Sequence, residues 1–282
     1  MQKIIIFKII FTCALIFFIT KQVNIDELLS KLHHNHLSFL MLSFLAQHLS
    51  LISSSYRSRL YLKAISIFPS LSQNIILYYI GSFYNNFLPG GVSGDGYKIY
   101  FLSKHHAVKK LTLLKTFLLE RINGVFVLGY FSCILFYLSD FRIHLSHISY
   151  FILFIIIIGI PAYLFISKKI LNDHSALKAL PYSICTQLLQ LIMIYCIILS
   201  FDYNLDFKSV IDYILLFAIA SILSIFPITI GGIGIRETIF FLGTNFIPNL
   251  DQDLGILIAS TSFLISLLAS ITGGLLSIKK IS

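Results

Sequence analysis

The sequence contains no tryptophan, and only 12% of its 282 residues are charged. Soluble domains average roughly a quarter charged residues, so this composition excludes an ordinary soluble globular protein. Hydrophobic residues make up 57% of the chain, and the mean hydropathy is +0.89. We therefore predict an integral membrane protein.

Cysteine is also scarce, and its placement excludes two kinds of site. The four cysteines, Cys13, Cys133, Cys185 and Cys196, lie in apolar runs and show no C-x-x-C spacing. Neither a zinc site nor a disulfide framework is indicated, and we expect buried thiols. No nucleotide-binding motif is present, so we expect no cofactor and no coupling to ATP hydrolysis.

Six apolar runs approach the roughly 20 residues needed to cross a bilayer. No small-residue cleavage site follows the first run, so we expect it to be a retained helix rather than a signal peptide. The sequence thus predicts an all-α polytopic membrane helix bundle with about six full spans. The runs are Ile4 to Thr20, Leu37 to Ile52, Leu111 to Leu138, Ile148 to Ile166, Pro181 to Ser200 and Leu254 to Ile278.

Basic and acidic residues occupy alternate loops, which explains the net charge of +9 without nucleic-acid binding. Positive-inside sorting then predicts that both termini face the cytoplasm. The basic residues are Arg57, Arg59, Lys63, Lys98, Lys104, Lys109, Lys110, Lys115, Lys168, Lys169, Lys178, Lys279 and Lys280. The acidic ones are Asp26, Glu27, Asp140, Asp202, Asp206, Asp212, Asp251 and Asp253.

Two segments are flanked by loops of the same charge type at both ends. Ile65 to Pro89 should begin and end on the cytoplasmic side, and Tyr213 to Ile247 on the external side. We predict that both are re-entrant broken helices, as in many secondary transporters. The alternative is that both span fully, giving eight crossings. In either case residues 1–282 are expected to form one membrane domain.

The first polar interruption is NNFLPGGVSGDGYK. Proline removes a backbone donor and glycine permits positive φ, so amide groups are free to face an anion. Asp95 and Lys98, three residues apart, would meet on one helix face. A surface loop with an ion pair is the alternative. The residues concerned are Asn85, Asn86, Pro89, Gly90, Gly91, Gly94, Asp95 and Lys98.

Glu120 and Arg121 form a second polar interruption, inside the third apolar run. A helix that begins near Leu111 would place them about 14 Å along its axis, close to the middle of the bilayer. Ionisable residues at that depth indicate a substrate or ion pathway. A structural ion pair is the competing interpretation, and the two roles are compatible.

The third interruption is FPITIGGIGIRE. A proline and closely spaced glycines should end one half-helix, and Arg236 with Glu237 should begin the next, where amide dipoles favour an anion. The pattern is neither a Walker loop nor a dinucleotide fingerprint. A simple turn between helices is the alternative. The residues concerned are Pro227, Gly231, Gly232, Gly234, Arg236 and Glu237.

In combination, NNFLPGGVSGDGYKIYFL, LERINGV and the late P-x-x-x-G-G-x-G-x-R-E array resemble the lysylphosphatidylglycerol synthase transmembrane family, the flippase-like membrane region of multiple-peptide-resistance factors. The resemblance implies a helical membrane protein with re-entrant helices that moves or handles lipids. Many relatives carry Arg where this sequence has Lys98, and lysine lacks bidentate phosphate recognition. We expect no soluble aminoacyltransferase domain, and therefore no lysyl transfer by this chain alone.

Our leading hypothesis is a non-enzymatic, flippase-like protein of the bacterial inner membrane for a membrane phospholipid or polyprenyl-phosphate lipid. A transferase acting on a lipid-linked substrate, with Asp95, Glu120 or a histidine as base, is the alternative. A third possibility is a partner of an envelope-biosynthesis enzyme, or a homo-oligomer. The expected substrate-binding residues are Asn85, Pro89, Gly94, Asp95, Lys98, Glu120, Arg121, Gly231, Gly232, Gly234, Arg236 and Glu237.

Overall fold

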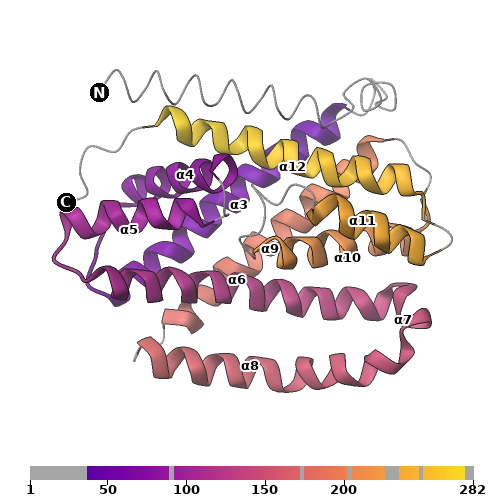
Figure 1. Cartoon of the computed structure of the whole chain (residues 1–282), viewed down its shortest axis with the longest axis horizontal. Coiled ribbons are helices and arrows are strands. Elements are labelled where there is room, and N and C mark those ends of the chain that lie inside the picture. Colours follow the sequence, from indigo (N-terminus) through magenta and orange to yellow (C-terminus); the bar gives the residue numbers. More distant parts are fainter. Residues whose placement is uncertain are drawn as a thin grey trace.

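The computed structural model describes residues 37–88, 92–171, 175–201, 205–225, 235–247 and 250–276, in which all regular structure is helical (Figure 1). The prediction of an all-α membrane helix bundle is confirmed. The helices are α3 Leu37–Ala64, α4 Leu71–Phe87, α5 Ser93–His105, α6 Lys110–Leu138, α7 Phe141–His144, the 3-10 helix η2 Ser146–Ile148, α8 Ser149–Leu171, α9 Ser175–Ser200, α10 Phe207–Leu223, α11 Ile235–Phe246 and α12 Gln252–Leu275.

Within the described residues, four helices are long and apolar enough to cross a membrane: α3, α6, α9 and α12. They correspond to four of the predicted spans, although α3 continues past Ile52 to Ala64. The fourth predicted run, Ile148 to Ile166, lies almost entirely in α8. The first predicted run, Ile4 to Thr20, lies outside the described residues.

Helices α3 and α9 pack against each other along much of their length and form the scaffold of the bundle. Small hydroxyl side chains allow close approach of membrane helices and provide hydrogen bonds between them. The Ser53 hydroxyl donates to the carbonyl of Tyr182 at 2.9 Å, and Ser54 and Thr186 hydroxyls lie 3.3 Å apart. On the outer face of α9 the Cys185 thiol is exposed, so the prediction of burial was wrong there, while Cys196 is buried.

Helices α4 and α5 form an antiparallel hairpin. Near the turn, the Gly94 amide donates to Asn85 Oδ1 at 2.8 Å, and the Tyr84 and Tyr97 rings lie 4.8 Å apart. The two ends remote from the turn share an apolar cluster in which Leu77 of α4 and Leu102 of α5 are both buried. The hairpin therefore has a tip near residue 88 and a base where both of its ends lie together.

The two helices of this hairpin approach closely because glycines meet at their crossing. A Cβ built on Gly94 would collide with the carbonyl oxygen of Gly81, whereas one on Gly96 would meet no atom within 4 Å. Without side chains at the crossing, the backbones come into direct contact. Gly94 is therefore a packing residue that fixes the position of its neighbour Asp95.

Helices α10 and α11 form a second antiparallel hairpin. At its base the Tyr213 hydroxyl of α10 donates to the carbonyl of Asp251, which follows α11, at 2.8 Å. Asp251 is also the N-cap of α12, where its side chain accepts from the Asp253 amide at 2.9 Å. Most of the predicted turning point of this segment, Phe226 to Glu237, lies outside the described residues, which resume at Ile235, the first residue of α11.

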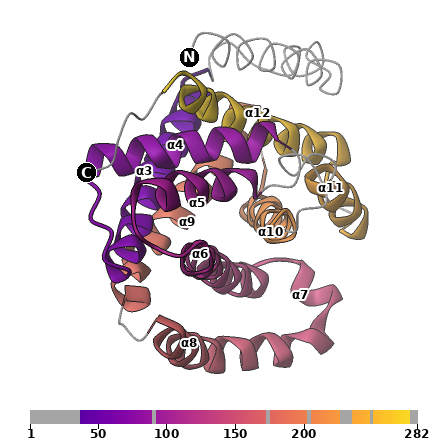
Figure 2. The ribbon, with the colours of Figure 1, turned by 60° about the vertical axis from the view of Figure 1, so that its left-hand side comes forward.

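Helix α6 connects the bases of the two hairpins. Leu113, near its first residue, belongs to the apolar cluster at the base of α4–α5. At its other end, the Asp140 amide donates to Asp212 Oδ1 of α10 at 3.1 Å. The hairpins thus approach the middle of the bundle from opposite ends, and α12 packs against both (Figures 1 and 2). Their re-entry into a membrane stays a prediction.

Candidate functional site

Two adjoining cavities lie where the hairpin tips meet, with volumes of about 310 Å³ and 240 Å³. We call them the first and the second cavity. They share a wall of six residues, so together they form one chamber. The shared residues are Arg57, Arg121, Gln190, Ser221, Ile225 and Arg236.

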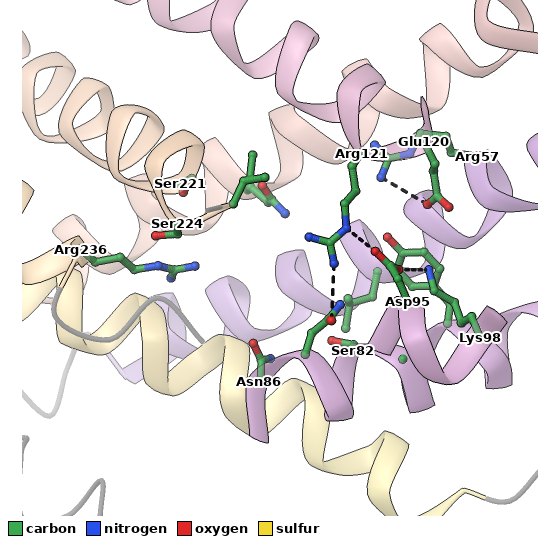
Figure 3. A pocket seen from close by; sticks show the side chains of 16 residues that line it. Arg57, Ser82, Asn86, Asp95, Lys98, Glu120, Arg121, Ser221, Ser224 and Arg236 are labelled. Atoms are coloured by element: carbon green, nitrogen blue, oxygen red, sulfur yellow. Dashed lines mark hydrogen bonds and ion pairs between the residues drawn. The ribbon is translucent and has the colours of Figure 1, made fainter. Parts of the chain in front are cut away.

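The chamber draws its wall from both hairpins and from the long helices between them (Figure 3). Asn85 and Asn86 come from the last turn of α4, and Ser224 follows the end of α10. The Asn86 amide donates to the carbonyl of Ser266 on α12 at 3.4 Å, which ties the first tip to α12. The shape of the chamber therefore depends on the positions of the tips of the α4–α5 and α10–α11 hairpins.

On the side of the first hairpin, Asp95 binds two cations. Lys98 Nζ lies 2.8 Å from Asp95 Oδ1, and Arg121 Nε of α6 donates to Asp95 Oδ2. Arg121 Nη2 also lies 3.5 Å from Asn85 Oδ1. The Lys98 ammonium lies 4.2 Å from the Phe117 ring centroid, a distance that permits a cation–π contact. These charges are therefore compensated where they lie.

A second ion pair joins α3 to α6. Arg57 Nη2 lies 3.6 Å from Glu120 Oε1, and the two residues are only 6% and 3% exposed. Arg57 Nη1 also lies 3.4 Å from the Ser183 hydroxyl of α9. Our assignment of Arg57 to a basic surface loop was wrong, because α3 continues through it and carries it into the interior. Lys98, assigned to the next basic loop, is also buried.

Arg236, at the start of α11, differs from Arg57, Lys98 and Arg121 because it forms no ion pair with a described residue, although Arg57 Nε is also buried without a partner among those residues. The Nε and Nη1 atoms of Arg236 are buried and have no hydrogen-bond partner among the described residues. Its guanidinium carbon lies 6.0 Å from the centroid of the Phe217 ring. In Figure 3 the side chain extends from the α10–α11 side into the space that faces Arg121. It is thus placed to receive an anion from the chamber.

The described residues that line the first cavity include four cationic and two anionic side chains. Each carboxylate is bound by at least one cation, so the excess charge is positive. A buried site of this kind attracts anions, because few other groups can offset its charge away from water. The cations are Arg57, Lys98, Arg121 and Arg236, and the anions are Asp95 and Glu120.

The structure brings together half of the residues predicted to bind substrate. Gly94 lies behind them at the helix crossing, and Glu237 lines neither cavity. Pro89, Gly231, Gly232 and Gly234 lie outside the described residues. Those that line the chamber are Asn85, Asp95, Lys98, Glu120, Arg121 and Arg236.

Sequence reasoning missed several polar lining residues, among them Arg57, Gln187, Gln190 and Ser221. Each of these residues is polar and lies in a helix whose other residues are mostly apolar. A signal existed for Arg57, since the segment SLISSSYRSR contains no proline or glycine that would end a helix at Ile52. The glutamines and Ser221 carry no such signal, because single polar residues in membrane helices also serve packing.

The chamber offers hydrogen-bond donors and positive charge rather than an evident general base. Asp95 accepts from both Lys98 and Arg121, and Glu120 is paired with Arg57. No histidine occurs among the described residues that line either cavity. The searched part of the chain also contains no cluster of three or more His, Cys, Asp or Glu side chains suited to a metal ion.

Comparison with known proteins agrees with the membrane architecture. The family model described as the lysylphosphatidylglycerol synthase TM region matches residues 5–274, which is nearly the whole chain. A search of curated proteins gave no match. The matched region contains both hairpins and every helix that lines the chamber. The chain therefore belongs to the lysylphosphatidylglycerol synthase transmembrane family, whose members are multi-pass membrane proteins tied to lipid handling.

Proposed function

We propose that this protein translocates a lipid with a phosphate-type anionic head group across the bacterial inner membrane. The observation that carries the proposal is Arg236, whose Nε and Nη1 have no partner among the described residues although they are buried at the edge of the chamber. A phosphate oxygen would accept hydrogen bonds from this guanidinium, which is well suited to phosphate recognition.

The position of the chamber supports transport. It lies between the tips of two hairpins whose bases are at opposite ends of α6. If the bases face the two sides of the membrane, the chamber lies near the midplane, where transporters with broken helices hold their substrates. Two re-entrant hairpins would then form the two sides of the path, with both termini in the cytoplasm.

The interactions of Asp95 and Arg121 provide a mechanism for exchange. In the structure Asp95 accepts from both Lys98 and Arg121. An entering phosphate would compete with Asp95 for Arg121 while it also bonds Arg236 on the opposite hairpin. The ligand would thus bridge the two hairpins. When the ligand leaves, the Asp95 carboxylate would bind Arg121 again.

A transferase is less well supported by these contacts. Transfer needs a general base or nucleophile that is free to react. Both oxygens of Asp95 are bound by cations and Glu120 Oε1 lies 3.6 Å from Arg57, although Glu120 Oε2 has no partner among the described residues; the described lining contains no histidine. Transfer remains an outcome that the experiment below can reveal.

The test is a leaflet-resolved assay in vesicles that contain the purified protein and a fluorescent phosphatidylglycerol or a polyprenyl phosphate. We expect movement above that of protein-free vesicles for an anionic lipid. Arg236→Gln should slow it about 10- to 100-fold, the equivalent of one charge-assisted hydrogen bond. Lys208→Gln, which changes an exposed cation outside the chamber, is the matched control.

Two results would overturn the proposal. One is an unchanged rate in Arg236→Gln at equal protein incorporation. The other is chemical conversion of the lipid by the wild-type protein without a change in its leaflet distribution, which would favour the transferase. Thermal unfolding in detergent should confirm that the variant is folded.

A further inference from the structure

The face of α6 that packs against α3 carries a carboxylate, an amide and a glycine. Glu120, Asn123 and Gly124 are three and four residues apart, which places them on one side of the helix. Arg57 of α3 lies against this side: its Nη2 is 3.6 Å from Glu120 Oε1, and a Cβ built on Gly124 would come within 3.1 Å of its Nη1 (Figure 3). Arg57 and Glu120 line the first cavity, whereas Asn123 lines neither cavity.

Asn123 has hydrogen-bond partners on two neighbouring helices. Its Nδ2 donates to the Tyr61 hydroxyl of α3 at 2.8 Å and to the Ala176 carbonyl of α9 at 3.3 Å. A backbone carbonyl only accepts, so the contact with Ala176 fixes the orientation of the amide. The Asn123 Oδ1 then accepts from the Ser183 hydroxyl of α9. Both Asn123 and Ser183 are completely buried.

The direction of these bonds determines how Ser183 interacts with Arg57. Because the hydroxyl proton of Ser183 is given to Asn123, its oxygen has lone pairs left, and Arg57 Nη1 donates to it at 3.4 Å. At the other end, the hydroxyls of Tyr61 and Tyr163 of α8 lie 3.1 Å apart. A buried polar network therefore runs from α8 to a cation of the chamber. Networks whose members are hydrogen-bonded make an interior rigid and specify one arrangement.

We infer that Asn123 is a positioning residue for lipid transport, which through Ser183 holds the Arg57 guanidinium beside Glu120. This role rests on the proposed function. With Arg57 in place, the charge of Glu120 is compensated, and the first cavity keeps its excess of positive charge. Without the network, the Arg57 side chain has other rotamers open to it. The uncompensated carboxylate of Glu120 would then repel an anionic head group.

The test measures how lipid movement depends on lipid concentration in the leaflet-resolved assay, with phosphatidylglycerol or a polyprenyl phosphate as the lipid. Asn123→Leu and Ser183→Ala should each raise the half-saturating mole fraction about 5- to 10-fold, the equivalent of one net hydrogen bond, and change the maximal rate less than about twofold. Ser183→Thr keeps the hydroxyl and should restore the wild-type value. Ser262→Ala, a buried serine of α12 outside both cavities whose hydroxyl donates to Ala259, is the matched control.

A double substitution separates positioning from a structural role. In Glu120→Gln no carboxylate is left for Arg57 to compensate, so adding Asn123→Leu should change the half-saturating mole fraction less than about twofold. A defect that came from packing alone would persist in this background. Thermal unfolding in detergent shows whether each variant is folded. Ser183→Ala, the smaller change, decides the outcome where Asn123→Leu does not fold.

A readout without lipid follows Arg57 itself. In protein that contains isotope-labelled arginine, the guanidinium NMR signal of Arg57 is identified by its loss in Arg57→Lys. This signal should shift in Asn123→Leu and in Ser183→Ala, because the guanidinium loses its fixed contact. It should stay unchanged in Ser262→Ala.

An unchanged Arg57 signal in folded Asn123→Leu and Ser183→Ala would overturn the inference. So would an effect of Asn123→Leu on the half-saturating mole fraction that is equally large with and without Glu120. Arg236→Gln separates this inference from the proposed function. Full lipid movement in Arg236→Gln together with shifted Arg57 signals would contradict the proposed function alone, whereas loss of movement in Arg236→Gln with no effect of Asn123→Leu would contradict the positioning role alone.

Discussion

The two hairpins differ in how their charges are compensated. At the tip of α4–α5, Asp95 is bound to Lys98 within its own helix and to Arg121 of α6. At the tip of α10–α11, two nitrogens of Arg236 are buried without a partner among the described residues. Both are ionisable residues close to a helix break, yet only the second leaves hydrogen-bonding capacity unused. Under the proposed function, the ionic groups of the first hairpin stabilise the fold, and Arg236 of the second hairpin binds the ligand.

The two hairpins also differ in how closely their helices pack at glycine residues. In the first hairpin a Cβ on Gly94 would meet the backbone of Gly81, while in the second a Cβ on Gly243 would meet the side chain of Leu216. A backbone contact has no way to relax, whereas a leucine side chain has other rotamers. We interpret the first hairpin as the more rigid of the two, with Asp95 held by its packing.

The largest effect on stability should come from Asp95. Asp95→Asn leaves the buried Lys98 beside Arg121 without the carboxylate that compensates both. Removing one partner of a buried ion pair costs about 3 to 5 kcal/mol of unfolding free energy. Arg236→Gln should cost less, since two of the buried guanidinium nitrogens that it removes have no hydrogen-bond partner among the described residues. Thermal unfolding in detergent would show a large fall in the midpoint for the first variant only, and equal falls would contradict the distinction between the hairpins.

Glycine substitutions should show an intermediate effect. Gly94→Ala should destabilise the protein by about 1 to 3 kcal/mol through overpacking against the backbone. Gly243→Ala should cost less, because Leu216 has room to change rotamer, and Gly96→Ala, with no atom within 4 Å, is the control. The same unfolding measurement checks this order. A larger loss for Gly243→Ala than for Gly94→Ala would show that the second hairpin is the more tightly packed.

The smallest effect should come from the exposed ion pair near the base of the second hairpin. Lys208 Nζ lies 2.9 Å from Asp140 Oδ1, but its side chain is 55% exposed. Exposed pairs contribute little because water and salt screen them. Lys208→Gln should leave the unfolding midpoint and its salt dependence unchanged. A clear loss of stability at low salt would mean that this contact holds the hairpin to α6.

Much of the architecture could be predicted from composition and hydropathy. Four of the six expected spans correspond to helices of sufficient length, and a fifth corresponds to α8. The boundary of α3 was placed too early at Ile52, because its second half is rich in serine and carries Arg57. Hydropathy falls there, but the helix is stabilised by α9 and α6 rather than by lipid. Packing against α9 and α6 therefore keeps α3 helical in a region where local hydropathy predicted its end.

The candidate site was predicted in part. Asp95, Glu120, Arg121 and Arg236 were recognised because charged residues are rare in apolar runs, and all four line the chamber. Their partners were not predicted, since the residues that pair lie up to 63 positions apart, as Arg57 and Glu120 do. Gln187 and Ser221 could not be distinguished from packing residues without the cavity they face.

The sequence by itself determined that this protein is a membrane helix bundle, which long apolar runs interrupted by a few charged motifs require. Only the tertiary structure decided which charges neutralise one another and which remain available. Hydropathy is a property of a segment and is evident from neighbouring residues. Compensation of a buried charge is a property of distance in space, and it depends on how α4–α5 and α10–α11 meet α3, α6 and α9.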